Sequence, residues 1–300
     1  MLLLKSFLRC WVLPPGFVYL LAIWVAGMIR GRHFSTLKQY LRHRDKLFVL
    51  ATGPSLSVDY PRYGDEIEKC DVAVMNFFAD SPLFLEVKPQ LYFLADPLFF
   101  TSFAALEKDG RGNQRIHVES FCNNLVKSVD WEMTLVVPDV ARRSEFVAHI
   151  GLNNNIHVLY YNSRLGMDWT TKIEMWMVKR QWISPPAWTV ANLSVGLGVV
   201  MGYREVWLLG ADTSMHTMMR VDQVTNELYL ENSHFYGDNK EKVRKSGIYD
   251  NPSTVASWLS AISKMFAGYE RIRSLADYCG VKVVNASSYS WIDSLDRAAK

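Results

Sequence analysis

The sequence predicts an α/β fold with a mainly parallel sheet. Short apolar runs alternate with longer helix-compatible stretches, and the runs are apolar on both faces, as buried parallel strands are. A single long polar interval, 213–251, interrupts this alternation. The 300 residues are 49% apolar and 21% charged, which is enough to bury one sizeable core. We therefore expect one main domain, at 46–300, with an insertion near its carboxyl third.

The expected elements follow this alternation along the chain. Strands are predicted at 46–51, 71–76, 90–95, 133–137, 156–161, 205–210 and 281–284. Helices are predicted at 99–108, 140–149, 168–180, 190–202 and 252–278. The last helix has Asn251 as its expected cap, Pro252 in its first turn and Gly280 just beyond its end.

The first 45 residues form a separate hydrophobic and basic segment. Positions 11–28 carry no charge and approach the length that spans a bilayer, but Pro14-Pro15-Gly16 interrupts them. Basic residues then follow, at Arg30, Arg32, Lys38, Arg42, Arg44 and Lys46. This pattern predicts an N-terminal membrane-associated helix, either single-pass or lying on the membrane surface, with the main domain on the cytoplasmic face of the inner membrane. The alternative is a helix packed on the domain's own core.

Charge and cysteine content exclude several classes of protein. A net charge of +3 with scattered basic residues disfavours nucleic-acid binding. The four cysteines are far apart and form no Cys-x-x-Cys pair, so neither a zinc site nor a disulfide framework is expected, and a reducing cytosol fits best. The sequence also has no Asp-x-Asp motif of the kind that holds a divalent cation, so no metal is expected.

Polar residues end the first three predicted strands. The stretch KLFVLATGPSLSVD, 46–59, runs from a strand into Thr52, Gly53, Pro54 and Ser55. Such a turn either reverses the chain or leaves backbone N–H groups free to hold phosphate or ribose. Asn76 ends the second strand between apolar neighbours, so its amide needs a partner, either the backbone or a ligand.

The interval 213–251 directly follows the predicted strand in VWLLGAD. Polar segments of this length are usually disordered or form lids over active sites, and ligands bind beyond the carboxyl ends of parallel strands. We therefore expect a lid here. Asp212, at the end of the strand motif, either binds the ligand or caps the segment that follows.

Taken together, LATGPSL, VAVMNFF, YFLADPLFF, LGVVMGYREVWLLGAD and SHFYGD resemble, in their order and spacing, the bacterial sialyltransferases of glycosyltransferase family 42. The resemblance runs from about residue 46 to the C-terminus. It implies a single Rossmann-like domain, a GT-A-like variant with a lid, which uses a CMP-activated acidic sugar and needs no cofactor. It also implies that Gly53-Pro54-Ser55 and Asn76 contact the cytidine nucleotide.

Several positions depart from the family pattern. Thr52 and Asp96 stand where the family has asparagines, Thr189 aligns near its Thr-Ser-Gly segment, and Ser214 replaces a tyrosine that contacts phosphate. Tyr229 or Tyr236 is a possible replacement for a second such tyrosine.

The catalytic positions depart as well. His234 matches the first histidine of the family's catalytic stretch, and Asp238 aligns with the catalytic histidine itself. Histidine has an ordinary pKa of about 6.5, which suits proton transfer near neutrality. We therefore expect His234 to be the base, with Asp238 as its orienter or as an alternative base. The competing interpretation is a surface histidine on a loop.

These observations predict a metal-independent inverting glycosyltransferase that moves a sialic acid-like sugar or Kdo from a CMP-sugar donor to a glycan acceptor. Membrane attachment would place it beside lipid-linked acceptors in lipopolysaccharide or other cell-surface polysaccharide synthesis. Two alternatives remain open. One is a pterin diphosphokinase-like enzyme that uses ATP and magnesium, and the other is a catalytically degenerate scaffold in a glycan assembly complex. The sequence does not predict an oligomeric state.

Overall fold

The computed structural model describes residues 43–164, 172–234, 237–242 and 254–298, together with the single positions 18, 21, 22, 25, 37 and 40. For residues 230–234 and 237–242 it describes the backbone alone. The predicted membrane-associated segment therefore lies almost wholly outside the described residues. Among the helices that are described, none combines the length and apolarity needed to cross a bilayer.

In the described part of the chain, eight strands form one parallel sheet in the order β11-β10-β6-β1-β2-β3-β4-β5. The strands are β1 (Lys46–Leu50), β2 (Asp71–Met75), β3 (Leu91–Phe93), β4 (Met133–Pro138), β5 (Ile156–Tyr161), β6 (Glu205–Leu209), β10 (Lys282–Asn285) and β11 (Asp296–Arg297). Strands β1 to β5 follow one another to one side, and the chain then returns to place β6 on the other side of β1. The predicted α/β fold with a mainly parallel sheet is confirmed.

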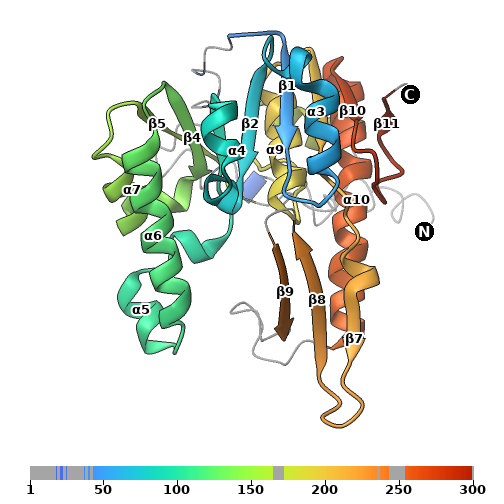
Figure 1. Cartoon of the computed structure of the whole chain (residues 1–300). Helices are drawn as coiled ribbons and strands as arrows, with labels where there is room; N and C mark the ends of the chain where they lie inside the picture. The colour runs from blue at the N-terminus through green and yellow to red at the C-terminus, as the bar shows by residue number, and fades with distance from the viewer. Residues whose placement is uncertain are drawn as a thin grey trace, which may run out of the picture.

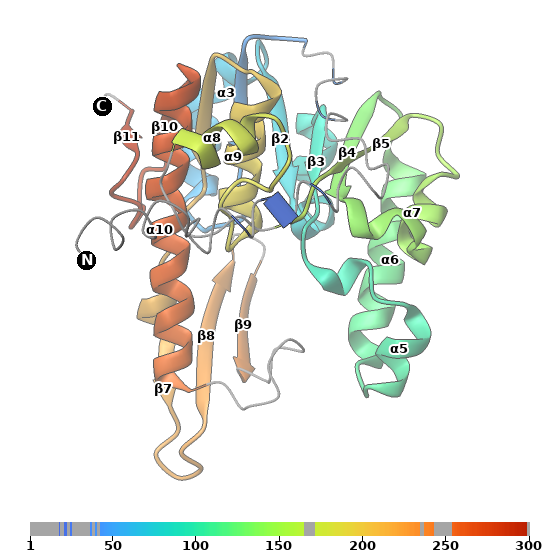
Figure 2. The ribbon, with the colours of Figure 1, turned by 180° about the vertical axis from the view of Figure 1, so that it is seen from behind.

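Helices cover both faces of this sheet (Figures 1 and 2). The face seen in Figure 1 carries α3 (Leu56–Ile67), α4 (Leu83–Val87), α6 (Gly112–Ser128) and α7 (Glu145–Ile150). The face seen in Figure 2 carries α8 (Lys172–Lys179), α9 (Val190–Met201) and α10 (Val255–Cys279). The short helix α5 (Phe103–Lys108) precedes α6.

Alternate residues of the central strands enter two separate cores. In β1, Leu47 and Val49 pack into the core beneath α8, α9 and α10, whereas Phe48 and Leu50 pack into the core beneath α3, α4, α6 and α7. All four side chains are fully buried. Because successive side chains of a strand point to opposite faces, this burial fixes the register of β1 and the direction of the turn that follows it.

The interval predicted as a lid forms a small antiparallel sheet instead of a plain loop. Its strands are β7 (Met219–Val221), β8 (Leu228–His234) and β9 (Gly237–Lys242), which follow a 3-10 turn at Met215–Met218. In Figure 1 this sheet lies beyond the carboxyl ends of the parallel strands, beside the lower half of α10.

The predicted helices need correction in several places. Helices α3, α4 and α6 were not among them, and the helices predicted at 99–108 and 140–149 begin later, as α5 and α7. Helix α10 begins at Val255, and its N-cap is Thr254, which exchanges hydrogen bonds with Ser257 in a capping box. Asn251 is therefore not the cap, although Gly280, at φ 69°, ends the helix as predicted. Helix α6 was not predicted at all, although its buried residues recur at helical spacing, at Val118, Phe121, Cys122 and Leu125.

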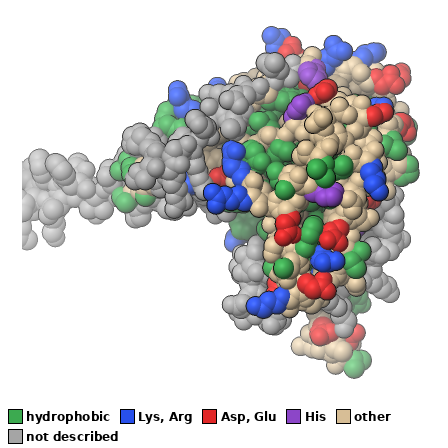
Figure 3. Space-filling model, turned by 90° about the vertical axis from the view of Figure 1, so that its left-hand side faces the viewer, with side chains coloured by type: hydrophobic (Ala, Val, Ile, Leu, Met, Phe, Trp, Pro, Cys, Tyr) green, Lys and Arg blue, Asp and Glu red, His purple; other side chains and the backbone are tan. Residues whose placement is uncertain are grey.

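The outer face around β5 and α7 mixes charges of both signs. In the part of this face that described residues form, acidic and basic side chains are interspersed (Figure 3). No broad basic patch is seen there, in line with the small net charge of +3.

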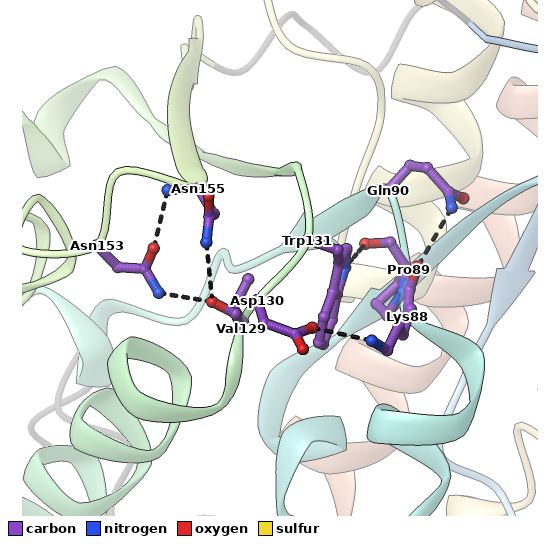
Figure 4. Close-up of polar contacts among 8 residues, drawn as sticks. All are labelled: Lys88, Pro89, Gln90, Val129, Asp130, Trp131, Asn153 and Asn155. Carbon is purple, nitrogen blue, oxygen red and sulfur yellow. Dashed lines mark hydrogen bonds and ion pairs between the residues drawn. The ribbon is translucent and has the colours of Figure 1, made fainter.

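The amino edge of the sheet is held by a network of polar side chains (Figure 4). Trp131 Nε1 donates to the Pro89 carbonyl at 2.9 Å, and Lys88 Nζ lies 2.9 Å from Asp130 Oδ1. Asn153 Nδ2 donates to the Val129 carbonyl, also at 2.9 Å. These contacts tie together the segments that enter β3, β4 and β5, so they stabilise the fold.

Candidate functional site

Strands β2 to β5 lie on one side of β1, whereas β6 lies on the other side, so the strand order reverses between β1 and β6. We call this position the switch point. In open parallel sheets, ligands bind beyond the carboxyl ends of the strands at such a point. The residues that leave β1 and β6 here are 51–55 and 210–214, which the sequence had singled out in part. The candidate site is therefore this edge, and its geometry follows from how the two segments pack.

Gly53 and Gly210 let the two exit segments approach closely. The Gly53 N–H donates to the Gly210 carbonyl oxygen at 2.8 Å. A Cβ added at Gly53 would lie 2.4 Å from that oxygen and 2.6 Å from Asp212 Oδ1, so no other residue fits without moving backbone. Gly210 itself has φ 66°, a left-handed conformation that favours glycine.

Asp212 fixes Ser55 at the start of α3. Its two carboxylate oxygens accept from the Ser55 N–H at 3.3 and 3.2 Å, and Oδ1 also accepts from the Ser55 hydroxyl. Burial raises the pKa of the Asp212 carboxyl, while the hydrogen bonds from Ser55 oppose that rise. Asp212 thus secures the preceding turn, a role the sequence did not suggest. The N–H groups of Gly53 and Ser55 are therefore bound within the protein and are not free for phosphate.

A buried carboxylate and a serine-rich segment complete the β6 exit, and sequence reasoning missed both. Asp59, on α3, is fully buried and accepts from the Gly210 N–H at 3.3 Å and the Ser288 N–H at 2.8 Å. Ser287 Oγ accepts from the Ala211 N–H at 3.0 Å. The sequence did contain one indication of this segment, the cluster of serines that follows the strand predicted at 281–284.

Thr189 is brought to the same exit by α9 and α10. It caps α9 through a reciprocal pair of hydrogen bonds with Asn192. The buried Tyr269 side chain, from α10, is hydrogen bonded to both Thr189 and Thr213, and burial raises the pKa of Tyr269. The predicted position of Thr189 near the site is thus observed, although its hydroxyl is engaged in capping.

Asn76 leaves β2 in a left-handed backbone conformation and with its side chain unpaired by the described residues. It follows β2 with φ 51°, a left-handed backbone that costs energy for a residue with a side chain. Its carbonyl accepts from the Tyr92 hydroxyl at 2.6 Å. Its side-chain amide is half-buried and has no hydrogen-bond partner within the described residues. The Thr52 hydroxyl, at the end of the adjacent strand, is half-buried and likewise lacks a partner there.

Asp96 and Ser214 both lie beyond the carboxyl ends of strands, but their surroundings differ. Asp96 follows β3, as predicted, but it is exposed, and its carboxylate accepts from the Leu98 N–H at 2.8 Å as the cap of a short turn. Ser214 is buried beyond β6, and its carbonyl accepts from the Thr217 hydroxyl at 2.8 Å. No partner of the Ser214 hydroxyl is found among described residues.

The two predicted catalytic residues lie at the turn end of the β8–β9 hairpin. The backbone of His234 pairs with Gly237, and that of Asp238 pairs with Ser233. Their side chains fall outside what the structure describes, as does Tyr236. The catalytic roles of His234 and Asp238 therefore stay predictions.

The structure adds a histidine–aspartate pair beside Asn76. His117, on α6, has Nε2 2.9 Å from Asp80 Oδ2, and its ring stacks on Phe77 with centroids 4.1 Å apart. Phe77 and Asp80 belong to the 3-10 turn, Asn76–Asp80, that leaves β2. Sequence spacing gave no signal for this pair, because α6 was not predicted.

The described residues contain no group of three His, Cys, Asp or Glu side chains placed to hold a metal ion. A scan against protein-family models finds no match, and a search of curated proteins finds none either. Among solved structures, the MAf glycosyltransferase from Magnetospirillum magneticum AMB-1 is similar over 89% of this chain, at 14% sequence identity and a TM-score of 0.45. The chain spans 37% of that protein's length. Membership of the sialyltransferase family stays a prediction from the sequence.

Proposed function

We propose that the chain is a glycosyltransferase that moves an acidic sugar, sialic acid-like or Kdo, from a CMP-sugar donor to a glycan acceptor. One observation carries the proposal. Beside the switch point, the neighbouring strands β1 and β2 end in half-buried polar side chains, Thr52 and Asn76, that have no partner within the described residues. A rigid turn, held by Gly53 and Asp212, lies beside them.

The unpaired groups suit a nucleotide. An asparagine amide both donates and accepts, so it pairs with a base edge or with ribose hydroxyls. The amide of Asn76 is half-buried and open to solvent, so a bound nucleotide would replace water on it. The left-handed backbone of Asn76 is a cost of a kind that clusters at ligand sites. The choice of cytidine rests on the family resemblance of LATGPSL and VAVMNFF.

The transfer itself needs charge balance and a base. As the bond to CMP breaks, the phosphate takes up charge, and we assign the Thr52 and Ser214 hydroxyls to stabilise it. The acceptor hydroxyl attacks from the opposite face and loses its proton to His234, with Asp238 as orienter or alternative base. No metal enters this scheme, and no cofactor other than the CMP-sugar donor is required.

The proposed setting is the cytoplasmic face of the inner membrane. The uncharged stretch and the basic residues of the first 45 positions support attachment to a membrane surface, as a peripheral or single-pass protein. A lipid-linked glycan in lipopolysaccharide or related polysaccharide synthesis is the acceptor this setting favours.

Calorimetric titration of the full chain with CMP tests the donor assignment. We expect CMP to bind, with UMP and AMP weaker and with binding unaffected by a metal chelator. Failure to bind CMP at millimolar concentration would overturn the proposal. Tighter binding of ATP with magnesium would favour the pterin diphosphokinase-like alternative.

A comparison of His234→Ala with His117→Ala tests the base. The readout is transfer from CMP-sugars to glycan acceptors, followed by mass spectrometry, alongside CMP binding. We expect His234→Ala to lose transfer while retaining CMP binding, and His117→Ala to retain both. The reverse result would assign the base to the His117–Asp80 pair. Intact transfer in His234→Ala and Asp238→Ala would remove both residues from the chemistry.

A further inference from the structure

The segment that follows β10 is held far more tightly than a surface loop requires. Ser290 Oγ donates to the Ala211 carbonyl at 2.6 Å and accepts from Asn285 Nδ2 at 3.0 Å. The Trp291 N–H donates to the Asp212 carbonyl at 3.0 Å. Together with the Asp59–Ser288 contact, these hydrogen bonds fix the backbone of residues 285–292 against the exit of β6.

This fixed backbone holds two large aromatic side chains in solvent. Tyr289 is 52% exposed and Trp291 is 47% exposed. Trp291 Nε1 donates to the Tyr289 hydroxyl at 2.7 Å, which orients the two rings relative to each other. Exposing apolar ring surface to water does not stabilise the isolated chain. A rigid, exposed aromatic pair therefore indicates a binding surface.

His216 supports the same interpretation from another element. Its ring meets the Trp291 ring edge-on, with centroids 4.3 Å apart and an interplanar angle of 88°. His216 Nδ1 is buried and has no hydrogen-bond partner among the described residues. The ring of His216 is therefore held by its packing against Trp291 and Phe266, and it supports the Trp291 ring from beneath the surface.

The position of this aromatic cluster separates it from the proposed nucleotide contacts. Trp291 lies against the exit of β6, whereas Asn76 ends β2. Strand β10 stands three strands from β2 in the sheet, which corresponds to roughly 14 Å at the usual strand spacing. A ligand at the aromatic cluster would thus lie along the same edge of the sheet as the proposed nucleotide contacts but apart from them, which leaves room for a second substrate.

We propose that Tyr289, Trp291 and His216 form a saccharide-binding platform that holds the acceptor glycan. A pyranose ring carries C–H groups along one face, and these pack against the electron-rich face of an aromatic ring, while ring hydroxyls remain free for hydrogen bonds. The assignment of the bound sugar as acceptor rests on the proposed transferase function. The binding of a saccharide to these rings does not depend on that function.

Saturation-transfer NMR with methyl β-D-galactopyranoside as the probe tests the platform. The full chain is compared with Trp291→Leu and Tyr289→Leu, and with Tyr278→Leu as the matched control. Tyr278 is also exposed, at 39%, but it lies at the end of α10, near the amino end of β10. We expect saturation transfer to the sugar in the wild type and in Tyr278→Leu. The affinity should fall about tenfold in Trp291→Leu and less in Tyr289→Leu.

Calorimetry with CMP on the same variants keeps the two proposals apart. We expect CMP affinity to be equal in all four proteins. Sugar binding without CMP binding in the wild type would leave the platform standing and remove the donor assignment. No transfer to the sugar in the wild type, or an unchanged affinity in Trp291→Leu with thermal unfolding intact, would overturn the platform. A loss of CMP affinity in Trp291→Leu would also overturn it, since the rings would then stack on the nucleobase.

Discussion

The two edges of the parallel sheet use their polar side chains in opposite ways. At the amino edge, Lys88, Asp130, Trp131 and Asn153 find partners in one another or in the loops that enter the strands (Figure 4). At the carboxyl edge, side chains such as Asn76 are left without a partner among the described residues. The carboxyl edge has paired groups as well, such as Asp212 with Ser55 and Asp59 with Ser288, but it differs from the amino edge in also presenting polar side chains that a ligand can use.

Gly53→Ala should have the largest effect, because it disrupts the scaffold of the carboxyl edge. The new Cβ would lie 2.4 Å from the Gly210 carbonyl oxygen, so backbone must move. We expect a loss of about 3 kcal/mol in the free energy of unfolding, together with loss of CMP binding.

Gly64→Ala in α3 is the matched control, since a Cβ added at Gly64 would meet nothing within 4 Å. It should be neutral or stabilising by about 0.5–1 kcal/mol in urea unfolding, because alanine favours a helix interior. Equal behaviour of the two alanine variants would mean that the close approach of β1 and β6 is not essential.

Asn153→Ala should weaken the amino edge alone. It removes the side-chain hydrogen bonds to the Val126 and Val129 carbonyls and the acceptor of the Asn155 N–H. We expect the free energy of unfolding to fall by about 2 kcal/mol while CMP affinity stays unchanged. A loss of CMP affinity in the folded variant would show that the two edges are coupled.

Asn76→Gly should leave stability almost unchanged and lower the CMP affinity, which is the reverse of the result expected for Asn153→Ala. Glycine adopts the left-handed backbone at φ 51° without strain and removes only the amide. We expect stability within about 0.5 kcal/mol of the wild type and a CMP affinity about tenfold lower by calorimetry. Asn76→Ala separates the two contributions, because it also adds backbone strain. If Asn76→Gly binds CMP as the wild type does, the amide does not contact the nucleotide.

Alkaline pH should also destabilise the amino edge, through its buried tyrosines. Burial raises the pKa of Tyr40 to about 12, and it also raises the pKa of Tyr203, which donates to the buried Asp71 at 2.7 Å. An unfolded tyrosine releases its proton near pH 10, whereas folded Tyr40 keeps it to about 12. The unfolded state then binds fewer protons, so stability falls as pH rises from 10 toward 12. Urea unfolding across this range should show a shallower decline in Tyr40→Phe, and an identical decline would exclude Tyr40 as a cause.

The sequence was sufficient to predict all strands of the parallel sheet except the two-residue edge strand β11. Every parallel strand from β1 to β6 was predicted to within two residues, because strands buried on both faces appear as compact apolar runs between turns. The small sheet β7–β9 was missed, since polar strands lack that signal. The carboxyl ends of the predicted strands also indicated Gly53 and Asn76 as site candidates, and their roles in ligand binding stay predictions.

The long-range hydrogen bonds that hold the site together could not be predicted in the same way. Asp59 and Ser288 are 229 positions apart, and no local pattern links a carboxylate in one helix to a serine after the last long strand. Asp212 looked equally suited to ligand binding and to capping, and only its distance from Ser55 decided for the turn. Periodicity indicates which face of an element is buried, but it does not identify a tertiary partner.

The Asp59 carboxylate joins the turn after β1 to a residue that is translated 229 positions later than Asp59 itself. During translation, the region around position 53 leaves the ribosome long before Gly210 and Ser288 exist. The nascent chain consequently cannot complete the hydrogen bonds of Asp59 at this edge until Ser288 has emerged, and a polypeptide that stops before Ser288 lacks this support.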